Sequence, residues 1–336
     1  MFLARPLGLF LSMTVAVQAG SNEGYIDSIK NFFHTQLGMS SSAKASSTSS
    51  TPSLSANSSP VKVSENASVT TPTETTSTPL TPAEVAVNAQ KDQEDVIFPH
   101  IATYKITLDK SAGNNEIDDA NGIMTIKIWD TGDGWVFEQN STLFIYSASG
   151  EGEQIHTNVA TWQDYAGNHY RFNSRTLRNE QEEDVIRGVA HKGAENAPGK
   201  IIYHMPNNME IDIPNETIFP LHHLINAVRH ARHGKTVISN TVFDGSAETQ
   251  EAVAVTTTIS QPKEVKIKVD SAMPKGLNLN KVWSMNLGVY PLNSKSVDPE
   301  YEIKQDVFDQ GIINTMTLDY GNFQVVATLD KIEFFT

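Results

Sequence analysis

Apolar and polar residues alternate along most of the chain beyond residue 96. Segments such as Thr103–Leu108 and Gly122–Trp129 place an apolar side chain at every second position. A period of two is typical of a strand with one buried and one solvated face. Turn-forming groups such as Thr131-Gly132-Asp133-Gly134 separate these segments. The pattern predicts fifteen strands, at Thr103–Leu108, Gly122–Trp129, Trp135–Gln139, Thr142–Tyr146, Gln154–Trp162, Tyr170–Thr176, Asp184–His191, Lys200–His204, Met209–Ile213, Val237–Phe243, Ala252–Ser260, Val282–Tyr290, Glu302–Phe308, Ile312–Tyr320 and Gln324–Phe334.

So many strands in roughly 240 residues favour a mainly β fold. A large antiparallel sheet that curls on itself, as a spiral or open barrel, limits the number of exposed sheet edges. A propeller is the competing architecture, but no motif recurs along the sequence at the period of a blade. We therefore expect one curled sheet.

One segment, residues 217–234, breaks the β pattern and predicts a helix of about four turns. Thr217 or a neighbour is available as the N-cap, Pro220 lies in the first turn, and Gly234 stands where a left-handed residue ends a helix. One helical face is apolar and is expected to fill the inside of the curled sheet: Leu221, Leu224, Ile225, Val228 and Ala231. The opposite face is polar: His222, His223, Asn226, Arg229, His230 and His233.

The histidines on this polar face are the only group of residues that suggests metal chemistry. Imidazoles one or two turns apart can ligate a metal ion. However, Arg229 and Arg232 lie among them, and no Asp or Glu on the helix offsets a cation's charge or orients the rings. We therefore interpret this face as solvated and weakly basic, and predict no metal site.

The N-terminal residues 1–19 have the pattern of a signal peptide. Arg5 precedes an apolar run, Leu7–Val17, and Ala19 ends a plausible cleavage point. A run of about 11 residues spans roughly 16 Å as a helix, too short for the ~30 Å hydrocarbon core of a membrane. The sequence therefore predicts export to the periplasm and no transmembrane segment in the mature chain.

Two further segments precede the β region. Residues 20–39 contain an amphipathic stretch, Tyr25–Leu37, which is expected to dock either on its own domain or on a partner or membrane surface. In residues 40–79, Ser, Thr and Pro make up 26 of 40 positions. Such a composition buries too little apolar surface to offset the entropy of ordering. We interpret residues 40–95 as a disordered linker and 96–336 as the folded domain.

Composition excludes several classes of protein. The chain has no Cys, so zinc ribbons, iron–sulfur proteins, thiol enzymes and disulfide scaffolds are not available to it. Its formal net charge is -14, and binding to phosphate backbones depends on clustered Lys and Arg. Nucleic acid is therefore not expected as a partner.

No established catalytic or cofactor-binding motif is present. GxSxG, GxGxxG, GxxxxGK[ST] and HExxH are all missing from the sequence. Asp164 and His169 flank one predicted turn and Ser147 and Ser149 lie near another, but no motif fixes their geometry as a triad. The acidic pairs Asp118-Asp119 and Glu182-Glu183 fit solvated charge, and the four Trp residues fit core packing, with an apolar pocket as the alternative. We predict no catalytic, cofactor-binding or metal residue and no cofactor.

The order of features resembles the EipB family of alphaproteobacterial periplasmic proteins, formerly a domain of unknown function. The resemblance runs from YKITL through GIMTIKIWDTGDGWVFEQN, enters the helix at IFPLHHLINAVRHARHGK, continues with TVISNTVFDGS and ends in LDYGNFQVVATLDKIEFF. It covers about residues 96–336. The helix with FDGS and the LDYGNF ending are its more specific parts.

This resemblance implies a β-spiral wound around a helix, similar in shape to Lol-pathway carriers. It implies a role in cell-envelope integrity under stress, a functional link to a periplasmic tetratricopeptide-repeat protein, and no enzymatic activity. Relatives commonly carry a disulfide between an early and a late strand, which this chain without Cys cannot form.

Two functions remain open from the sequence. The first is a non-enzymatic periplasmic protein that supports the envelope by binding another protein. The second is a Lol-like carrier that holds lipid or lipoprotein in the curled sheet. An unrecognised hydrolase is a weaker third possibility, because convergent sites escape sequence motifs.

Overall fold

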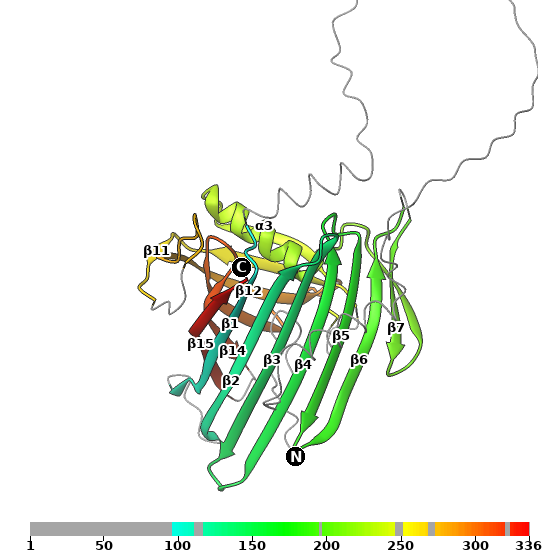
Figure 1. Cartoon of the computed structure of the whole chain (residues 1–336). Coiled ribbons are helices and arrows are strands. Elements are labelled where there is room, and N and C mark those ends of the chain that lie inside the picture. Colours follow the sequence, from blue (N-terminus) through cyan, green and yellow to red (C-terminus); the bar gives the residue numbers. More distant parts are fainter. Residues whose placement is uncertain are drawn as a thin grey trace, which may run out of the picture. The chain divides into compact units, whose positions relative to one another are not determined.

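The computed structural model describes residues 96–110, 117–194, 197–245, 251–267, 273–319 and 323–335. The predicted signal peptide, amphipathic segment and linker, residues 1–95, lie outside the described residues. The described part is mainly β, as predicted, with one helix (Figure 1). Within these ranges, no helix has the length and hydrophobicity that a membrane crossing requires.

Fifteen strands and one helix follow one another along the chain. They are β1 (His100–Leu108), β2 (Ile117–Asp130), β3 (Gly134–Ser147), β4 (Gly152–Asp164), β5 (His169–Arg178), β6 (Gln181–His191), β7 (Gly199–Met205), β8 (Met209–Ile213), α3 (Pro220–Arg232), β9 (Val237–Val242), β10 (Val253–Ile259), β11 (Lys263–Glu264), β12 (Lys281–Pro291), β13 (Tyr301–Phe308), β14 (Ile313–Asp319) and β15 (Gln324–Phe334).

The structure differs from the predicted strands at two places. The segments Trp135–Gln139 and Thr142–Tyr146 belong to a single strand, β3, because Asn140 and Ser141 continue the ladder opposite Asn158 and Thr157 of β4. A polar pair in mid-strand had suggested a break, but a ladder needs only backbone groups. The two-residue strand β11 was not predicted, since two residues are too few to show a period.

All strand pairs in the sheet are antiparallel, and the first and last strands meet in its middle. The order is β8-β7-β6-β5-β4-β3-β2-β1-β15-β14-β13-β12-β10-β9, with β11 beside β12. Strand β1 pairs with β15 from His100 opposite Phe334 to Leu108 opposite Val325. The sheet therefore ends at β8 and β9, and α3 connects these two edge strands along the chain.

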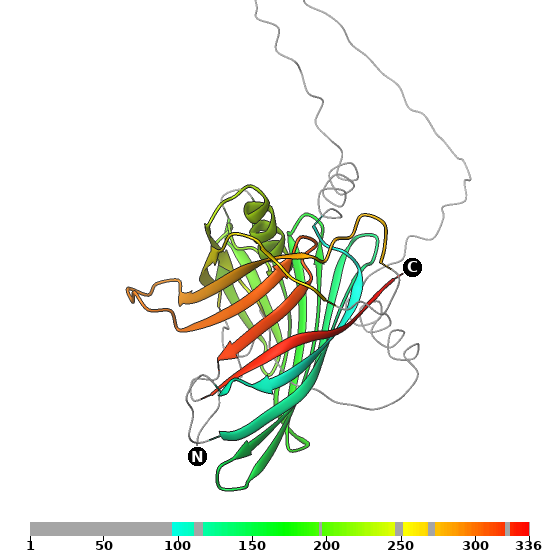
Figure 2. The same cartoon turned by 90° about the vertical axis from the view of Figure 1, so that its left-hand side faces the viewer.

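The curled sheet has two walls with α3 between them. Figure 2 shows the N-terminal strands as one wall, in cyan and green, and the C-terminal strands crossing it, in yellow to red, with α3 near the upper end. The apolar side of α3 packs into one continuous core with residues from both walls, including Met124, Leu143, Val255 and Leu287. The prediction that the helix fills the inside of the sheet is confirmed.

Two smaller apolar clusters complete the core. An aromatic cluster joins β5 and β7 to the segments that flank α3 and β9, and it contains Tyr170, Phe172, Tyr203, Phe219 and Phe243. The rings of Tyr170 and Phe219 stack with centroids 4.8 Å apart. A third cluster packs Leu277 and Leu279 against Val282 and Phe308.

Local sequence explains where α3 begins and ends. Pro220 occupies the first turn, where its missing N–H costs nothing, but the N-cap is Phe219, which offers no side-chain cap. Thr217, the expected cap, is instead fully buried one residue before the bridge from Ile218 to Val242. At the other end Gly234 takes φ 69°, and the N–H of Lys235 donates to the His230 carbonyl at 2.9 Å. This is a Schellman motif, which glycine favours because it lacks a Cβ.

A buried tyrosine forms a hydrogen bond between the two walls, and its substitution tests how much this bond stabilises the fold. The Tyr104 hydroxyl on β1 donates to the Ile313 carbonyl on β14 at 3.0 Å, and burial raises its pKa. We expect Tyr104→Phe to lower the free energy of unfolding by about 1 kcal/mol, because a buried acceptor loses its donor. Urea denaturation measures this change. The matched control is Tyr146→Phe on a 43% exposed ring, and equal losses in both variants would contradict the proposed link.

Candidate functional site

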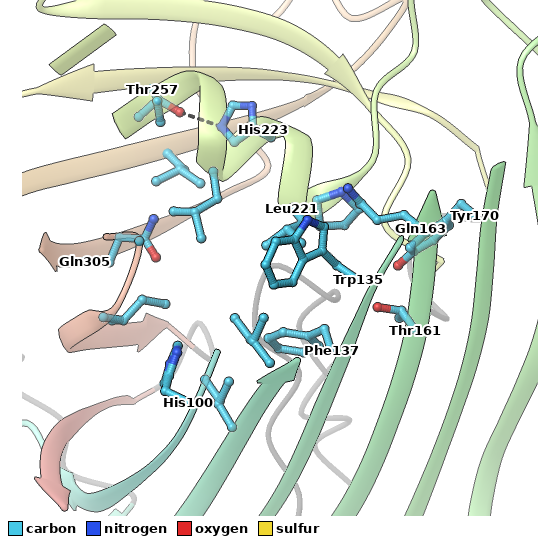
Figure 3. Close-up of a pocket in the computed structure, with 18 of the residues that line it drawn as sticks. His100, Trp135, Phe137, Thr161, Gln163, Tyr170, Leu221, His223, Thr257 and Gln305 are labelled. Atoms are coloured by element: carbon cyan, nitrogen blue, oxygen red, sulfur yellow. Dashed lines mark hydrogen bonds between the residues drawn. The ribbon is translucent and has the colours of Figure 1, made fainter. Parts of the chain in front are cut away.

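A chamber of about 70 Å³ lies beneath α3, between the helix and the inner faces of both walls (Figure 3). Ligand sites in proteins are typically apolar concavities with a few convergent polar groups. The chamber fits this description and is therefore the candidate functional site. Its lining includes His100, Tyr104, Ile126, Ile128, Trp135, Phe137, Thr161, Gln163, Tyr170, Pro220, Leu221, His223, Leu224, Ala227, Thr257, Leu287, Gln305, Gly311 and Ile313.

His223 attaches the helix to the C-terminal wall. Its Nδ1 lies 3.1 Å from Asn240 Oδ1. Its Nε2 lies 3.0 Å from Thr257 Oγ1, the bond drawn in Figure 3. An amide oxygen only accepts, so Nδ1–H donates to Asn240 and Nε2 accepts from the Thr257 hydroxyl. Burial lowers the pKa of His223 to about 4, against the opposing effect of the Asn240 hydrogen bond. The imidazole is therefore neutral at pH 7.

His222 attaches the same helix to the N-terminal wall. Its Nε2 lies 3.2 Å from the Tyr165 carbonyl, and its Nδ1 lies 2.5 Å from Gln163 Nε2. Nε2–H therefore donates to Tyr165, and Nδ1 accepts from the Gln163 amide. Burial lowers the pKa of His222 to about 4. Gly167, at φ 67°, allows this contact, because a Cβ there would lie 2.9 Å from the ring.

These bonds leave hydrogen-bond acceptors along the chamber. Gln163 uses its amide nitrogen on His222, and its Oε1 is buried without a hydrogen-bond partner among the described residues. His100 Nδ1 donates to the Phe98 carbonyl at 2.6 Å, which leaves Nε2 as an acceptor, and burial lowers the pKa of His100 to about 4. A molecule in the chamber would have to donate hydrogen bonds.

The chamber has no acidic residue, Lys or Arg in its described lining. A charged ligand would therefore lose its hydration without gaining a counter-charge. The volume is about half that of the ~150 Å³ apolar cavity that admits benzene. In this conformation the chamber accommodates waters or a very small neutral molecule, and not an acyl chain.

The structure corrects the predicted role of the histidine face of α3. His222 and His223 were expected on a solvated surface, but both attach the helix to the sheet. The prediction assumed an apolar partner for the buried face, whereas polar side chains of β4, β9 and β10 meet it. His230 and His233 are exposed, and their Nδ1–H groups donate to the carbonyls of Asn226 and Arg229. The described residues contain no group of metal-ligating side chains.

The other polar residues noted in the sequence form no common site. Asp164 and His169 pair at 3.0 Å in the turn after β4, whereas Ser147 and Ser149 bond at 2.7 Å in the turn before it. The length of β4 therefore separates the two pairs. Glu182 and Glu183 form surface ion pairs with Arg175 and Arg178.

Only one of the four Trp residues lines the chamber. Trp135 is buried there and packs edge-on against Tyr165 with ring centroids 6.3 Å apart. Trp162 is buried on the opposite face of the sheet, where Arg171 stands 4.8 Å over its ring. Trp283 packs against the main core, so core packing explains Trp135 and Trp283.

A buried ion pair on the outer face escaped the sequence analysis. Glu138 of β3 lies directly opposite Lys127 of β2, with Oε2 3.9 Å from Nζ and both side chains at most 9% exposed. Burial raises the pKa of Glu138 to about 7, partly offset by Lys127. Lys127 and Glu138 occupy positions where a strand ordinarily carries exposed polar residues, so no sequence signal marked them as buried.

Comparison with known proteins agrees with this architecture. The EipB-like family model matches residues 91–336, most of the chain. The chain belongs to the EipB-like family. It is 24% identical over 245 residues to the cell envelope integrity protein EipB of Brucella abortus, an alignment that covers 71% of this chain and 85% of that protein.

A solved structure has the same fold as this chain. The crystal structure of a β-barrel-like protein of the domain of unknown function DUF1849, from Brucella abortus, superimposes with a TM-score of 0.62 at 22% identity. The match covers 71% of this chain and 99% of the other. The family model confirms the family resemblance predicted from the sequence, and the solved structure confirms the mainly β fold.

The neutral histidines make stability depend on pH. Unfolded imidazoles bind protons below about pH 6.5, whereas His100, His222 and His223 stay neutral in the folded chain down to about pH 4. Below 6.5 the unfolded state therefore holds more protons, and the free energy of unfolding falls as pH falls toward 4. Glu138 opposes this trend, because its raised pKa lets the folded state take up a proton first between about 7 and 4.5.

A single substitution isolates one contribution to this slope. We expect His223→Gln to make the fall between pH 6 and 4.5 shallower by up to about 1.4 kcal/mol per pH unit, because one such titration is removed. Urea denaturation at several pH values measures the slope. The difference between variant and wild type at pH 8 gives the packing cost alone, and parallel curves below pH 6 would refute a neutral His223.

Proposed function

We propose that this chain is a non-enzymatic periplasmic protein that supports cell-envelope integrity by binding another protein through the outside of its sheet. Membership of the EipB-like family and the name of the Brucella relative support the envelope role. The predicted signal peptide supports the location. The resemblance makes a periplasmic tetratricopeptide-repeat protein the partner type to test first.

The observation that carries the binding role is the small space left inside the sheet. Helix α3 occupies the interior and leaves a chamber of about 70 Å³. Large molecules would therefore contact the outer surface and the edges of the sheet. Edge strands present unpaired backbone groups to which another chain can bind. Two exposed apolar side chains mark these edges, Met209 of β8 at 38% and Val237 of β9 at 55%.

A lipid or lipoprotein carrier is the second candidate. The apolar walls of the chamber, which include Trp135, Phe137, Leu224 and Leu287, favour it. An acyl chain would require α3 to move away from the sheet. That movement would break the bonds of His222 and His223 to both walls, which makes this the less favoured function.

Crosslinking in intact cells tests both candidates. A photoreactive amino acid replaces Met209 or Val237, and a third variant carries it at Leu287 within the core. We expect the two edge variants, but not the core variant, to form a crosslink with the same periplasmic protein. Proteins and lipids are identified by mass spectrometry from each eluate.

Two results would count against the favoured function. Crosslinks of equal yield at edge and core positions would indicate non-specific capture. Lipid recovered in equal molar amount with the chain, and crosslinked at Leu287, would instead identify a carrier. Loss of resistance to envelope stress in a deletion strain, restored by the wild-type chain, tests the envelope role independently.

A further inference from the structure

A second hollow lies on the outer face of the N-terminal wall, away from the chamber. It has a volume of about 590 Å³, within the ~300–1,000 Å³ typical of small-molecule sites. It crosses β1 to β4 and is bounded by the turn between β5 and β6. Its lining includes Lys105, Ile106, Thr107, Asn121, Gly122, Ile123, Thr142, Phe144, Gln154, His156 and Glu180.

Strand register places these side chains in two adjacent rows. Ile123, Thr142 and His156 lie directly opposite one another on β2, β3 and β4. The next row consists of Asn121, Phe144 and Gln154. Ile123 is 49% exposed, so an accessible apolar floor stands beside hydroxyl, amide and imidazole groups.

Two polar atoms in the first row have no hydrogen-bond partner among the described residues. Thr142 is 4% exposed, and neither its Oγ1 nor Nδ1 of the neighbouring His156 is paired within that part of the chain. Polar groups that are buried without a hydrogen bond destabilise the folded chain. Burial also lowers the pKa of His156. A ligand that hydrogen-bonds to both atoms, once the two side chains rotate toward the hollow, would offset this destabilisation.

The turn beside the hollow carries a carboxylate where the backbone favours glycine. Asn179 and Glu180 have φ values of 51° and 66°, and no other non-glycine residue in the described chain has a positive φ. In four other hairpin turns the left-handed position holds Gly132, Gly150, Gly167 or Gly311. Asn is tolerated at such a position, but Glu is strained there.

The backbone strain at Glu180 therefore destabilises the folded chain, although the hairpin does not require a glutamate at this position. Its charge acts to raise the pKa of His156, so the carboxylate lies near that imidazole. The turn is held against β4, where Asn179 N–H donates to the Gln154 carbonyl at 2.7 Å and Gln154 N–H donates to Asn179 Oδ1 at 2.9 Å. Strained backbone that aims a functional group is typical of binding sites.

The charges around the hollow favour a neutral, hydroxyl-rich ligand. Lys105, the one cation in the described lining, is paired with Asp330 at 2.6 Å, and Glu180 would repel an anion. Amide, carboxylate, imidazole and hydroxyl groups beside an apolar floor match a sugar ring, which has an apolar face and equatorial hydroxyls. We propose that this hollow binds a neutral oligosaccharide of the cell envelope, an inference that rests on the proposed envelope location.

In this site each group has a defined part. One sugar ring packs on Ile123 and Phe144. Its hydroxyls bond to Thr142 Oγ1 and His156 Nδ1 after rotation of these two side chains, and Glu180 accepts from a further hydroxyl. The binding is non-covalent.

Titration calorimetry with purified full chain tests the proposal. The probes are chitotetraose and maltotetraose, which are neutral, and tetragalacturonate, which is anionic. We expect at least one neutral probe to bind and tetragalacturonate not to bind. Phe144→Ala and Glu180→Gly are each expected to weaken the neutral probe about tenfold, the loss of one good contact.

Glu180→Gly also separates binding from stability. Glycine relieves the strained turn, so its melting temperature is expected to rise by a few degrees while affinity falls. The matched control, Glu182→Gln, removes the same charge from the same hairpin outside the hollow and is expected to bind like wild type.

Three results would overturn the proposal. These are no binding of either neutral probe at millimolar concentration, unchanged affinity in Phe144→Ala and Glu180→Gly, or tighter binding of tetragalacturonate. Crosslinks from the edge strands to a periplasmic protein would remain in any of these cases. Failure of the oligosaccharide site and failure of the proposed function are thus distinguishable.

Discussion

The pairing of β1 with β15 is the interaction on which the rest of the structure depends. It brings the first and last strands of the domain together in the middle of the sheet, from His100 opposite Phe334 to Leu108 opposite Val325. Because the two meanders grow outward from this junction, their far ends, β8 and β9, become the sheet edges that α3 connects. The chain has no Cys, so backbone hydrogen bonds and buried side chains such as Tyr104 hold the junction. Contacts between residues more than 200 positions apart carry a large loop-closure cost, and we expect folding to be slow for this reason.

Once the junction has formed, the helix must fit between two walls that present polar as well as apolar groups. Its apolar side chains pack in the main core, but its position is fixed by His222 on Gln163 and Tyr165 and by His223 on Asn240 and Thr257. Both imidazoles are neutral because burial disfavours their charged form. The same polar contacts that fix α3 keep the chamber small. An interior that is stabilised in this way favours function at the outer surface over transport of a large ligand inside.

The sequence predicts the periodic features of this fold well and its exceptions poorly. Alternation identifies the strands because each has one buried face, and Pro220 with Gly234 marks the helix because both residues have backbone requirements that few others meet. His223 escapes such reasoning, since its position on a helical wheel is polar and only β9 and β10 supply its buried partners. Ser141 similarly suggests a break within β3 that the ladder does not have. Neither hollow is visible in the sequence, because strand register across distant segments creates both.

The two hollows differ in what explains their unpaired polar atoms. In the chamber, Gln163 has donated its amide to His222, and the unpaired Oε1 follows from fixing the helix; a water fits there and can satisfy it. On the outer face, Thr142 Oγ1 and His156 Nδ1 have no partner among the described residues, and the neighbouring Glu180 occupies a backbone position that four other turns give to glycine. Folding alone explains the first arrangement but not the second. Unpaired polar atoms and a strained turn that stabilise no part of the fold are better explained by a ligand. This favours the outer hollow over the chamber as the site that recognises another molecule.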